Sequence, residues 1–151
     1  MTARDSITFE VGTAQLTVPK QDLLEAYIAK TLGTASKKGI ALAAGETYVG
    51  SITNADGTGH HIILLAGDVE KNWTDALDWA KSIGGDLPNR IEQAMLCAHH
   101  RDRFEKRAYW SNQKHESDDG FAWCQTFDYG GQYYDHQISR LRAVAVRRLP
   151  I

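Results

Sequence analysis

Residues 84–92 read Gly84-Gly85-Asp86-Leu87-Pro88-Asn89-Arg90-Ile91-Glu92, and they separate two segments whose apolar residues recur with helical spacing. A glycine pair is typical of a helix end, because glycine readily adopts the left-handed conformation that closes the last turn. Asn89 is a good N-cap for a second helix, and Glu92 follows three residues later in a capping-box pattern. The segment therefore predicts a tight corner between two helices.

Each predicted helix carries an apolar stripe. The first helix begins after Asn72, and its stripe comprises Trp73, Ala76, Leu77, Ala80 and Ile83. The second helix begins after Asn89, and its stripe comprises Ile91, Ala94, Met95 and Ala98. We expect both stripes to face the core of the domain.

A strand pair is predicted before the first helix. Tyr48, Gly50 and Ile52 alternate and should share one face of a strand. Residues 54–59 contain Asp-Gly, a strong hairpin turn signal. The continuous apolar run in residues 60–66 predicts a central strand that is covered on both faces.

The last third of the chain alternates strands with polar segments. Strands are predicted at residues 109–111, 121–127 and 140–148, and polar loops at residues 112–120 and 128–139. Trp110 and Trp123 lie on the predicted strands, and we expect both in the core.

Residues 1–45 are predicted to be a hairpin-helix arm followed by a linker. Ile7, Phe9 and Val11, then Leu16 and Val18, have the two-residue period of a strand pair, with Gly12-Thr13 near its turn. Residues 20–32 have helical spacing, and residues 33–45 are rich in Gly, Ala, Ser and Lys. A hairpin of this size does not hold a core alone. Two readings stay open: a docking or oligomerisation arm within residues 1–38, or another layer of one core.

Composition limits the class of protein. The chain has 151 residues with 42% hydrophobic content, too apolar for a disordered chain. A net charge of −2 gives no global basic surface, so we do not expect a nucleic-acid partner. No apolar run is long enough to span a bilayer, and the N-terminus lacks the apolar core of a signal peptide. We therefore expect no membrane insertion and synthesis in the cytoplasm, with later association with a virion left open.

The order of strand pair, Trp-led helix, glycine corner, second helix and late Trp-containing strands resembles that of the C-type-lectin-like domains of the bacterial and phage branch. The likeness covers roughly residues 46–149. It rests on the Gly84–Glu92 corner and on three late segments: Tyr109-Trp110-Ser111, Ala122-Trp123 with Phe127, and residues 140–148. That branch includes formylglycine-generating-enzyme-like domains, a collagen-like adhesin's C-terminal domain and retroelement variable proteins. The resemblance implies an α+β domain (residues 46–151) with a twisted antiparallel sheet, two helices and a display surface on late loops.

The candidate binding residues lie in the two late polar segments. Tyrosine supplies a large, rigid contact area, and glycine supplies adaptability. The second segment contributes Tyr129, Gln132, Tyr133, Tyr134, Asp135 and His136. The first contributes Gln113, His115 and Asp118. The alternatives are that Tyr133 or Tyr134 anchors the second loop from below, and that the first loop is a solvated turn.

Catalytic and metal-binding patterns are missing from the sequence. The histidines do not have ligand spacing, and the acids lack the calcium motifs that the resemblance implies for calcium-dependent members. We expect no metal, no cofactor and no enzyme activity. A Cys124–His136 nucleophile pair has no support from spacing, and a buried inert thiol is the commoner arrangement. Cys97 and Cys124 are expected as reduced thiols, with a bridge between them left open.

The sequence thus predicts a phage- or prophage-type binding domain that recognises a host protein or surface glycan through loops 112–120 and 128–139. Two alternatives stay open. One is an intracellular interaction or inhibitor protein that acts on a host enzyme or defence complex. The other is a structural particle component assembled through the N-terminal arm.

Overall fold

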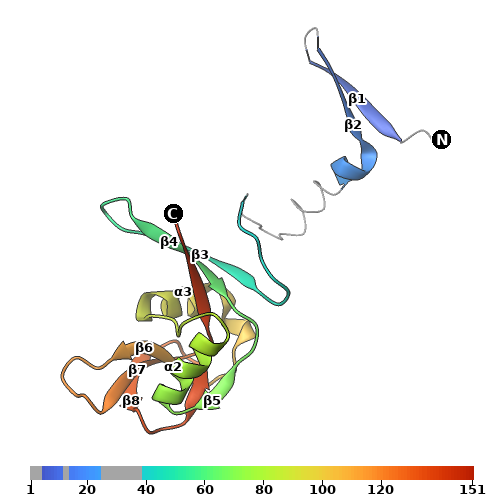
Figure 1. Cartoon of the computed structure of the whole chain (residues 1–151). Coiled ribbons are helices and arrows are strands. Elements are labelled where there is room, and N and C mark those ends of the chain that lie inside the picture. Colours follow the sequence, from blue (N-terminus) through green and yellow to red (C-terminus); the bar gives the residue numbers. More distant parts are fainter. Residues whose placement is uncertain (1–4, 12–13, 25–38) are drawn as a thin grey trace. The chain divides into compact units, whose positions relative to one another are not determined.

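Two sheets and two main helices make up residues 42–151 of the computed structural model, which describes residues 5–11, 14–24 and 39–151 (Figure 1). The predicted α+β class is therefore correct. The elements of residues 42–151 are, in chain order, β3 (Thr47–Thr53), β4 (Gly59–Leu64), β5 (Val69–Lys71), α2 (Trp73–Ser82), α3 (Arg90–His100), the 3-10 helix η1 (Arg101–Arg103), β6 (Ala108–Lys114), β7 (Phe121–Thr126), β8 (Gln132–His136), β9 (Leu141–Ala143) and β10 (Val146–Pro150).

The smaller of the two sheets has the order β10-β4-β3, and both pairs are antiparallel. The prediction of a central strand near residues 60–66 is confirmed. Ile62 and Ile63 point to opposite faces of β4, and both are fully buried. The larger sheet has the order β5-β9-β6-β7-β8, so β8 lies at its edge.

The two helices cover opposite faces of the five-stranded sheet. Trp73 and Ala76 of α2 pack with Trp110 and Cys124, which are paired across β6 and β7. We call this the α2 face. Leu96 of α3 packs on the other face, with Tyr109, in a second apolar cluster that includes Ile62 and Val146 of the smaller sheet. We call this the α3 face.

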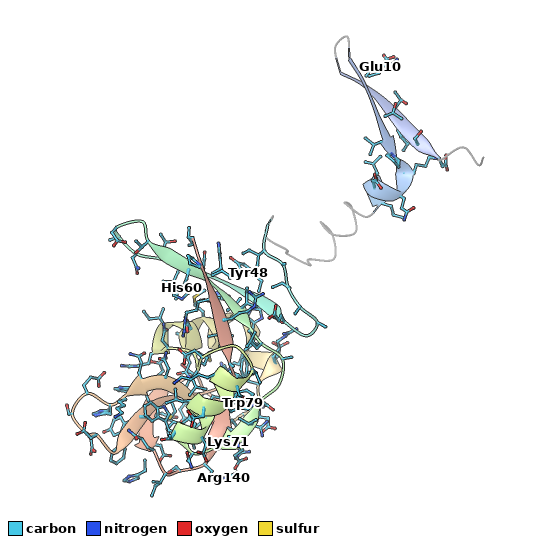
Figure 2. The ribbon with its side chains drawn as sticks, in the orientation of Figure 1. Glu10, Tyr48, His60, Lys71, Trp79 and Arg140 are labelled. Carbon is cyan, nitrogen blue, oxygen red and sulfur yellow. The ribbon has the colours of Figure 1, made fainter. Side chains whose placement is uncertain are left out.

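Helix α2 and its end follow the sequence closely. Asn72 caps the helix by accepting a hydrogen bond from the Asp75 amide, 2.9 Å. Gly84, at φ +84°, donates to the Lys81 carbonyl, and Gly85 donates to the Ala80 carbonyl. These two bonds form a Schellman motif, so the glycine pair ends the helix as predicted. Trp79, which is half-buried, packs against the α2-face cluster (Figure 2), whereas Ile83 lies at the C-cap and is 40% exposed.

Helix α3 begins as predicted, but its apolar stripe is not its buried face. Asn89 and Glu92 form the capping box. The fully buried residues are Glu92, Gln93 and Leu96. Of the predicted stripe, only Met95 is half-buried, while Ile91, Ala94 and Ala98 are exposed. The prediction was wrong because the inward side of this helix carries polar groups that bond within the protein.

The buried Glu92 carboxylate explains this inversion. It accepts hydrogen bonds from Arg148 Nε and Nη2, at 2.6 and 2.8 Å, from His60 Nε2 at 2.8 Å and from the Asn89 amide at 2.8 Å. Burial acts to raise the pKa of Glu92, but the Arg148 and Asn89 hydrogen bonds outweigh it, so the pKa lies below its ordinary value. Arg148 also binds Asp86 in the corner, 2.8 Å. An ionic network therefore joins α3 to both β4 and β10.

Both predicted late loops are shorter in the structure. Strand β6 continues to Lys114, so the first loop contains only residues 115–120. Strand β8 lies inside the predicted second loop and divides it into two turns, at residues 127–131 and 137–140. The second segment is therefore half of a hairpin with β7, and its side chains alternate between the two faces of the sheet.

One face assignment in β3 was also wrong. The register between β3 and β4 shifts between Tyr48 and Gly50, which marks a β-bulge at Val49. Val49 is buried in the α3-face cluster together with the half-buried Ile52. Tyr48 pairs with Ile63 on the opposite face from Gly50 and Ile52, and its hydroxyl lies 3.1 Å from His61 Nδ1.

The chain divides into two compact units, residues 1–41 and 42–151; the sequence predicts this division at residue 45. In the first unit, β1 (Ser6–Val11) pairs antiparallel with β2 (Ala14–Pro19), and a helix begins at residue 20. The Lys20 amide and ammonium both bind Asp5, each at 2.9 Å. The predicted turn at residues 12–13 and the rest of the predicted helix lie outside the described residues. No helix in the described ranges is long and apolar enough to cross a membrane.

Candidate binding surface

An aromatic patch occupies the part of the α3 face that α3 leaves uncovered. Residues of β7 and β8 that pair across the hairpin share a face, so Trp123 lies beside Tyr134, and Phe121 beside His136. Ring centroids are 5.5 Å apart in the first pair and 4.0 Å in the second. His115, from the short loop, lies 4.2 Å from the Tyr134 ring. We define the aromatic patch as His115, Phe121, Trp123, Tyr134 and His136.

Polar groups fix the geometry of the patch. The Arg90 guanidinium lies over the Trp123 ring, 3.6 Å from its centroid. The indole nitrogen of Trp123 donates to the Glu116 carboxylate, at 3.1 Å from Oε2. Tyr134 stays 50% exposed. Polar neighbours therefore fix the rings of the patch, and the Tyr134 ring is the one that a partner can reach.

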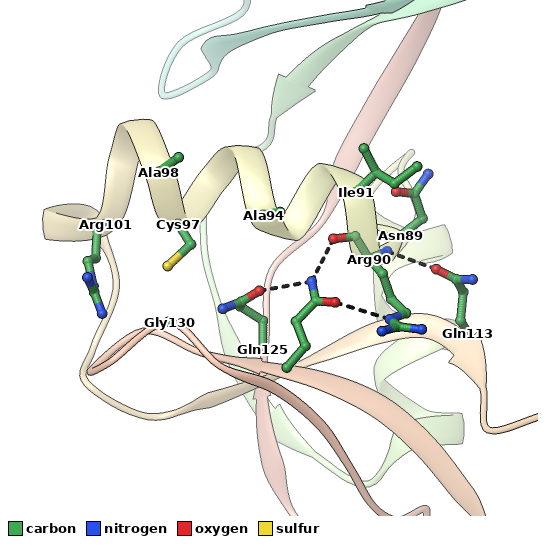
Figure 3. A pocket seen from close by; sticks show the side chains of 11 residues that line it. Asn89, Arg90, Ile91, Ala94, Cys97, Ala98, Arg101, Gln113, Gln125 and Gly130 are labelled. Carbon is green, nitrogen blue, oxygen red and sulfur yellow. Dashed lines mark hydrogen bonds between the residues drawn. The ribbon is translucent and has the colours of Figure 1, made fainter. Parts of the chain in front are cut away.

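A groove of about 810 Å³ adjoins the patch, between α3 and β8 (Figure 3). Its floor is polar: the side-chain Nε2 of Gln132 donates to the Arg90 carbonyl, 2.7 Å, and to Gln125 Oε1, 3.0 Å. The Arg90 Nε donates to Gln132 Oε1, 3.1 Å. The lining residues are Asn89, Arg90, Ile91, Ala94, Cys97, Ala98, Arg101, Gln113, Gln125, Gly130 and Gln132.

The predicted residues of the second segment separate by face. Gln132, Tyr134 and His136 lie on the α3 face, in or beside the patch and groove. Tyr133 lies on the α2 face, where it packs against the core and its hydroxyl bonds to Thr126 and Tyr129. Asp135 also lies on that face, and its carboxylate accepts from Ser139 Oγ, 2.9 Å. Tyr129, in the turn, is 69% exposed.

The three predicted residues of the first segment also differ in position. Gln113 belongs to β6 and accepts from the Arg90 amide, 2.8 Å, at the rim of the groove. His115 is part of the patch. The Asp118 carboxylate accepts from the Gly120 amide, 3.0 Å, as in a polar turn.

Sequence reasoning missed Arg90, Phe121 and Trp123 as residues of this surface, and placed Glu116 only within the predicted loop at residues 112–120. The expectation that Trp123 is a core residue was wrong, since it is half-buried outside both core clusters. The alternation of side chains along β7 already indicated in the sequence on which face Trp123 lies. Ala122 and Cys124 are small and fit under a helix, so the large Phe121 and Trp123 had to face the other way.

The Cys124 thiol offers little reactivity. Cys97 and Cys124 are not bridged. Burial raises the pKa of the Cys124 thiol to about 12, and Cys124 lies on the α2 face while His136 lies on the α3 face. These two side chains therefore do not form a nucleophile pair. Within the described residues, no three His, Cys, Asp or Glu side chains converge as metal ligands.

Comparison with protein-family models finds no match for this chain, and comparison with curated proteins finds none either.

Proposed function

We propose that residues 42–151 form a non-enzymatic binding domain that recognises a host protein or glycan, as phage-type C-type-lectin-like domains do. The observation that carries the proposal is the aromatic patch beside an open groove. Half-buried aromatic rings gathered on one face around an exposed tyrosine are typical of a surface that a partner covers. Rings held by polar neighbours supply contact area at low entropic cost.

The arrangement of elements supports the C-type-lectin-like reading. A strand pair precedes a Trp-led helix, the glycine corner leads into a second helix, and Trp-bearing strands follow. Late in the chain, β10 returns to pair with β4. The proposal moves the binding surface from the loops themselves to the face of the β7–β8 hairpin and the loop at residues 115–120.

Immobilised protein tests this proposal against cytosolic and envelope extracts of bacterial hosts and against a glycan array. The variant is Tyr134→Ala, and the matched control is Thr74→Ala at an exposed position on α2. We expect a protein or glycan that is retained by the wild type and by Thr74→Ala but not by Tyr134→Ala. Retention from the envelope favours surface recognition, and retention from the cytosol favours an inhibitor of a host enzyme or defence complex. Equal retention by both variants would contradict the role of the patch.

A second candidate is assembly into a particle through the N-terminal unit. The specific observation is the β1–β2 hairpin, because a two-stranded hairpin is at best marginally stable alone. Deletion of residues 1–38 should lower the mass in solution to that of a monomer, as measured by light scattering. An unchanged number of subunits would contradict this candidate, and it would not bear on the proposed binding surface.

A further inference from the structure

Strand β8 is an open edge along half its length. The Thr126 amide donates to the Gly131 carbonyl and the Gln137 amide to the Gly120 carbonyl, both at 2.9 Å, so the odd-numbered residues of β8 bond to β7. The backbone groups of Gln132, Tyr134 and His136 therefore point away from the sheet. The His136 amide bonds to Asp135 and its carbonyl to Ser139. The outward amide and carbonyl groups of Gln132 and Tyr134 have no partner among the described residues.

The groove lies beside this edge on the α3 face. A residue paired opposite Gln132 in an added strand would share its face and would enter the groove that Gln132 lines. The outer rim there is apolar: Ile91 is 63% exposed, and Ala94 and Ala98 are exposed. In Figure 3 the Cys97 side chain points toward the hairpin, whereas Ile91 and Ala98 point away from it. The open edge and the apolar rim thus fit one extended chain with an apolar side chain.

The groove is also positively charged. Arg90 and Arg101 lie toward the two ends of α3. Arg90 is ion-paired with Glu116, 3.9 Å, so the charge of the groove rests on Arg101. Arg101 donates to the carbonyls of Phe127 and Asp128, at 3.0 and 2.5 Å. Within the described part of the chain it forms no ion pair. This charge is complementary to an acidic side chain or terminal carboxylate.

We propose that the partner is an acidic protein segment that adds to β8 as a further strand. Its backbone bonds to Gln132 and Tyr134, one apolar side chain enters the groove against Ala94 and Cys97, and its acidic groups lie near Arg101. A peptide repeats its donors and acceptors about every 6.8 Å along a strand, which matches alternate residues of β8. This inference rests on the proposed function and assigns its partner to proteins instead of glycans.

The first experiment uses a displayed library of random linear peptides, and selected peptides are synthesised for measurement. Amide hydrogen exchange is then followed by NMR with and without peptide. We expect slower exchange at Gln132 and Tyr134 in the complex, and no change at Tyr133, whose amide already bonds to β7. We also expect selected sequences with an apolar residue flanked by Asp or Glu.

Variants separate the groove from the rest of the surface. Ala94→Glu should weaken peptide binding at least about tenfold, because it fills the groove and repels acids. Ala94→Gln has the same size without the charge and should bind more tightly than Ala94→Glu. Thr74→Glu, in the first turn of α2, is the control and should bind as the wild type does.

Four outcomes would overturn the inference. Peptide binding with unchanged exchange at Gln132 and Tyr134 would do so, and so would retention of glycans alone, while each leaves the proposed function standing. Protection of the same amides by rising protein concentration without peptide would identify a second copy as the occupant. If no peptide, glycan or extract component is retained at all, the proposed function fails together with the inference.

Discussion

The two faces of the β7–β8 hairpin differ in the size and the burial of their side chains. On the α2 face, Ala122 and Cys124 are small and buried beneath a helix. On the α3 face, Phe121 and Trp123 are large and half-exposed, although α3 covers the neighbouring part of the sheet. Packing accounts for the first face, because burial removes its apolar surface from water. Packing does not account for the second face, which is why we propose that this face serves recognition.

The contrast is tested most strongly by the two tryptophans of neighbouring strands. Trp110 is fully buried and its indole nitrogen donates to the Lys71 carbonyl, 3.0 Å. Trp110→Ala should lower the free energy of unfolding by about 3–5 kcal/mol. Trp123→Ala removes ring contacts at the surface and should cost about 1 kcal/mol. Urea unfolding followed by circular dichroism measures both, and equal losses would erase the distinction between the faces.

The next largest effect concerns the two sides of α3, one ionic and one apolar. Glu92→Gln leaves Arg148 without its main carboxylate partner and should cost about 3 kcal/mol at pH 7. The pKa of Glu92 is lowered from 4.5, so its ionisation stabilises the fold above about pH 4.5, and that stability is lost as pH falls through the lowered folded value. The difference between wild type and Glu92→Gln should therefore shrink below pH 4.5. A constant difference down to the acid transition would show that Glu92 does not titrate in this way.

The adjacent Tyr133 and Tyr134 of β8 lie on opposite faces of the sheet and allow the two faces to be compared directly. Tyr133 packs against the α2-face core, so Tyr133→Ala should cost about 2 kcal/mol. Tyr134 is 50% exposed, so Tyr134→Ala should change stability by less than about 0.5 kcal/mol while it removes binding. Melting curves should thus show the larger loss for Tyr133→Ala, and partner retention should show the larger loss for Tyr134→Ala. Loss of stability in Tyr134→Ala would place it among the packing residues.

The smallest effect is chemical. Cys124 is buried with its pKa raised to about 12, whereas Cys97 is half-buried beside the groove. A thiol reagent at neutral pH should label Cys97 in the folded protein and Cys124 only after unfolding. Mass spectrometry of the native and denatured protein reads this directly. Labelling of Cys124 in the folded state would mean that the α2 face opens readily.

Sequence patterns predicted the elements better than their buried sides. The glycine corner, both helix starts and the central strand follow from local chemistry that acts over a few residues. The buried side of α3 does not, because Glu92 is buried only through Arg148 and His60, which come from distant strands. Strand β8 was missed because a tyrosine-rich polar segment was interpreted as a loop. Gly130-Gly131 between two aromatic segments was the available hairpin signal.

The pairing of β10 with β4 has a consequence for synthesis. Val146 pairs with Leu64, so roughly eighty residues must leave the ribosome between one partner strand and the other. Until then Ile62 and Ile63 lack half of their sheet, and Glu92 lacks Arg148. A nascent chain of this protein therefore carries an apolar strand with one unpaired edge for most of its translation, and chaperones that hold exposed strand edges would act on it during that interval.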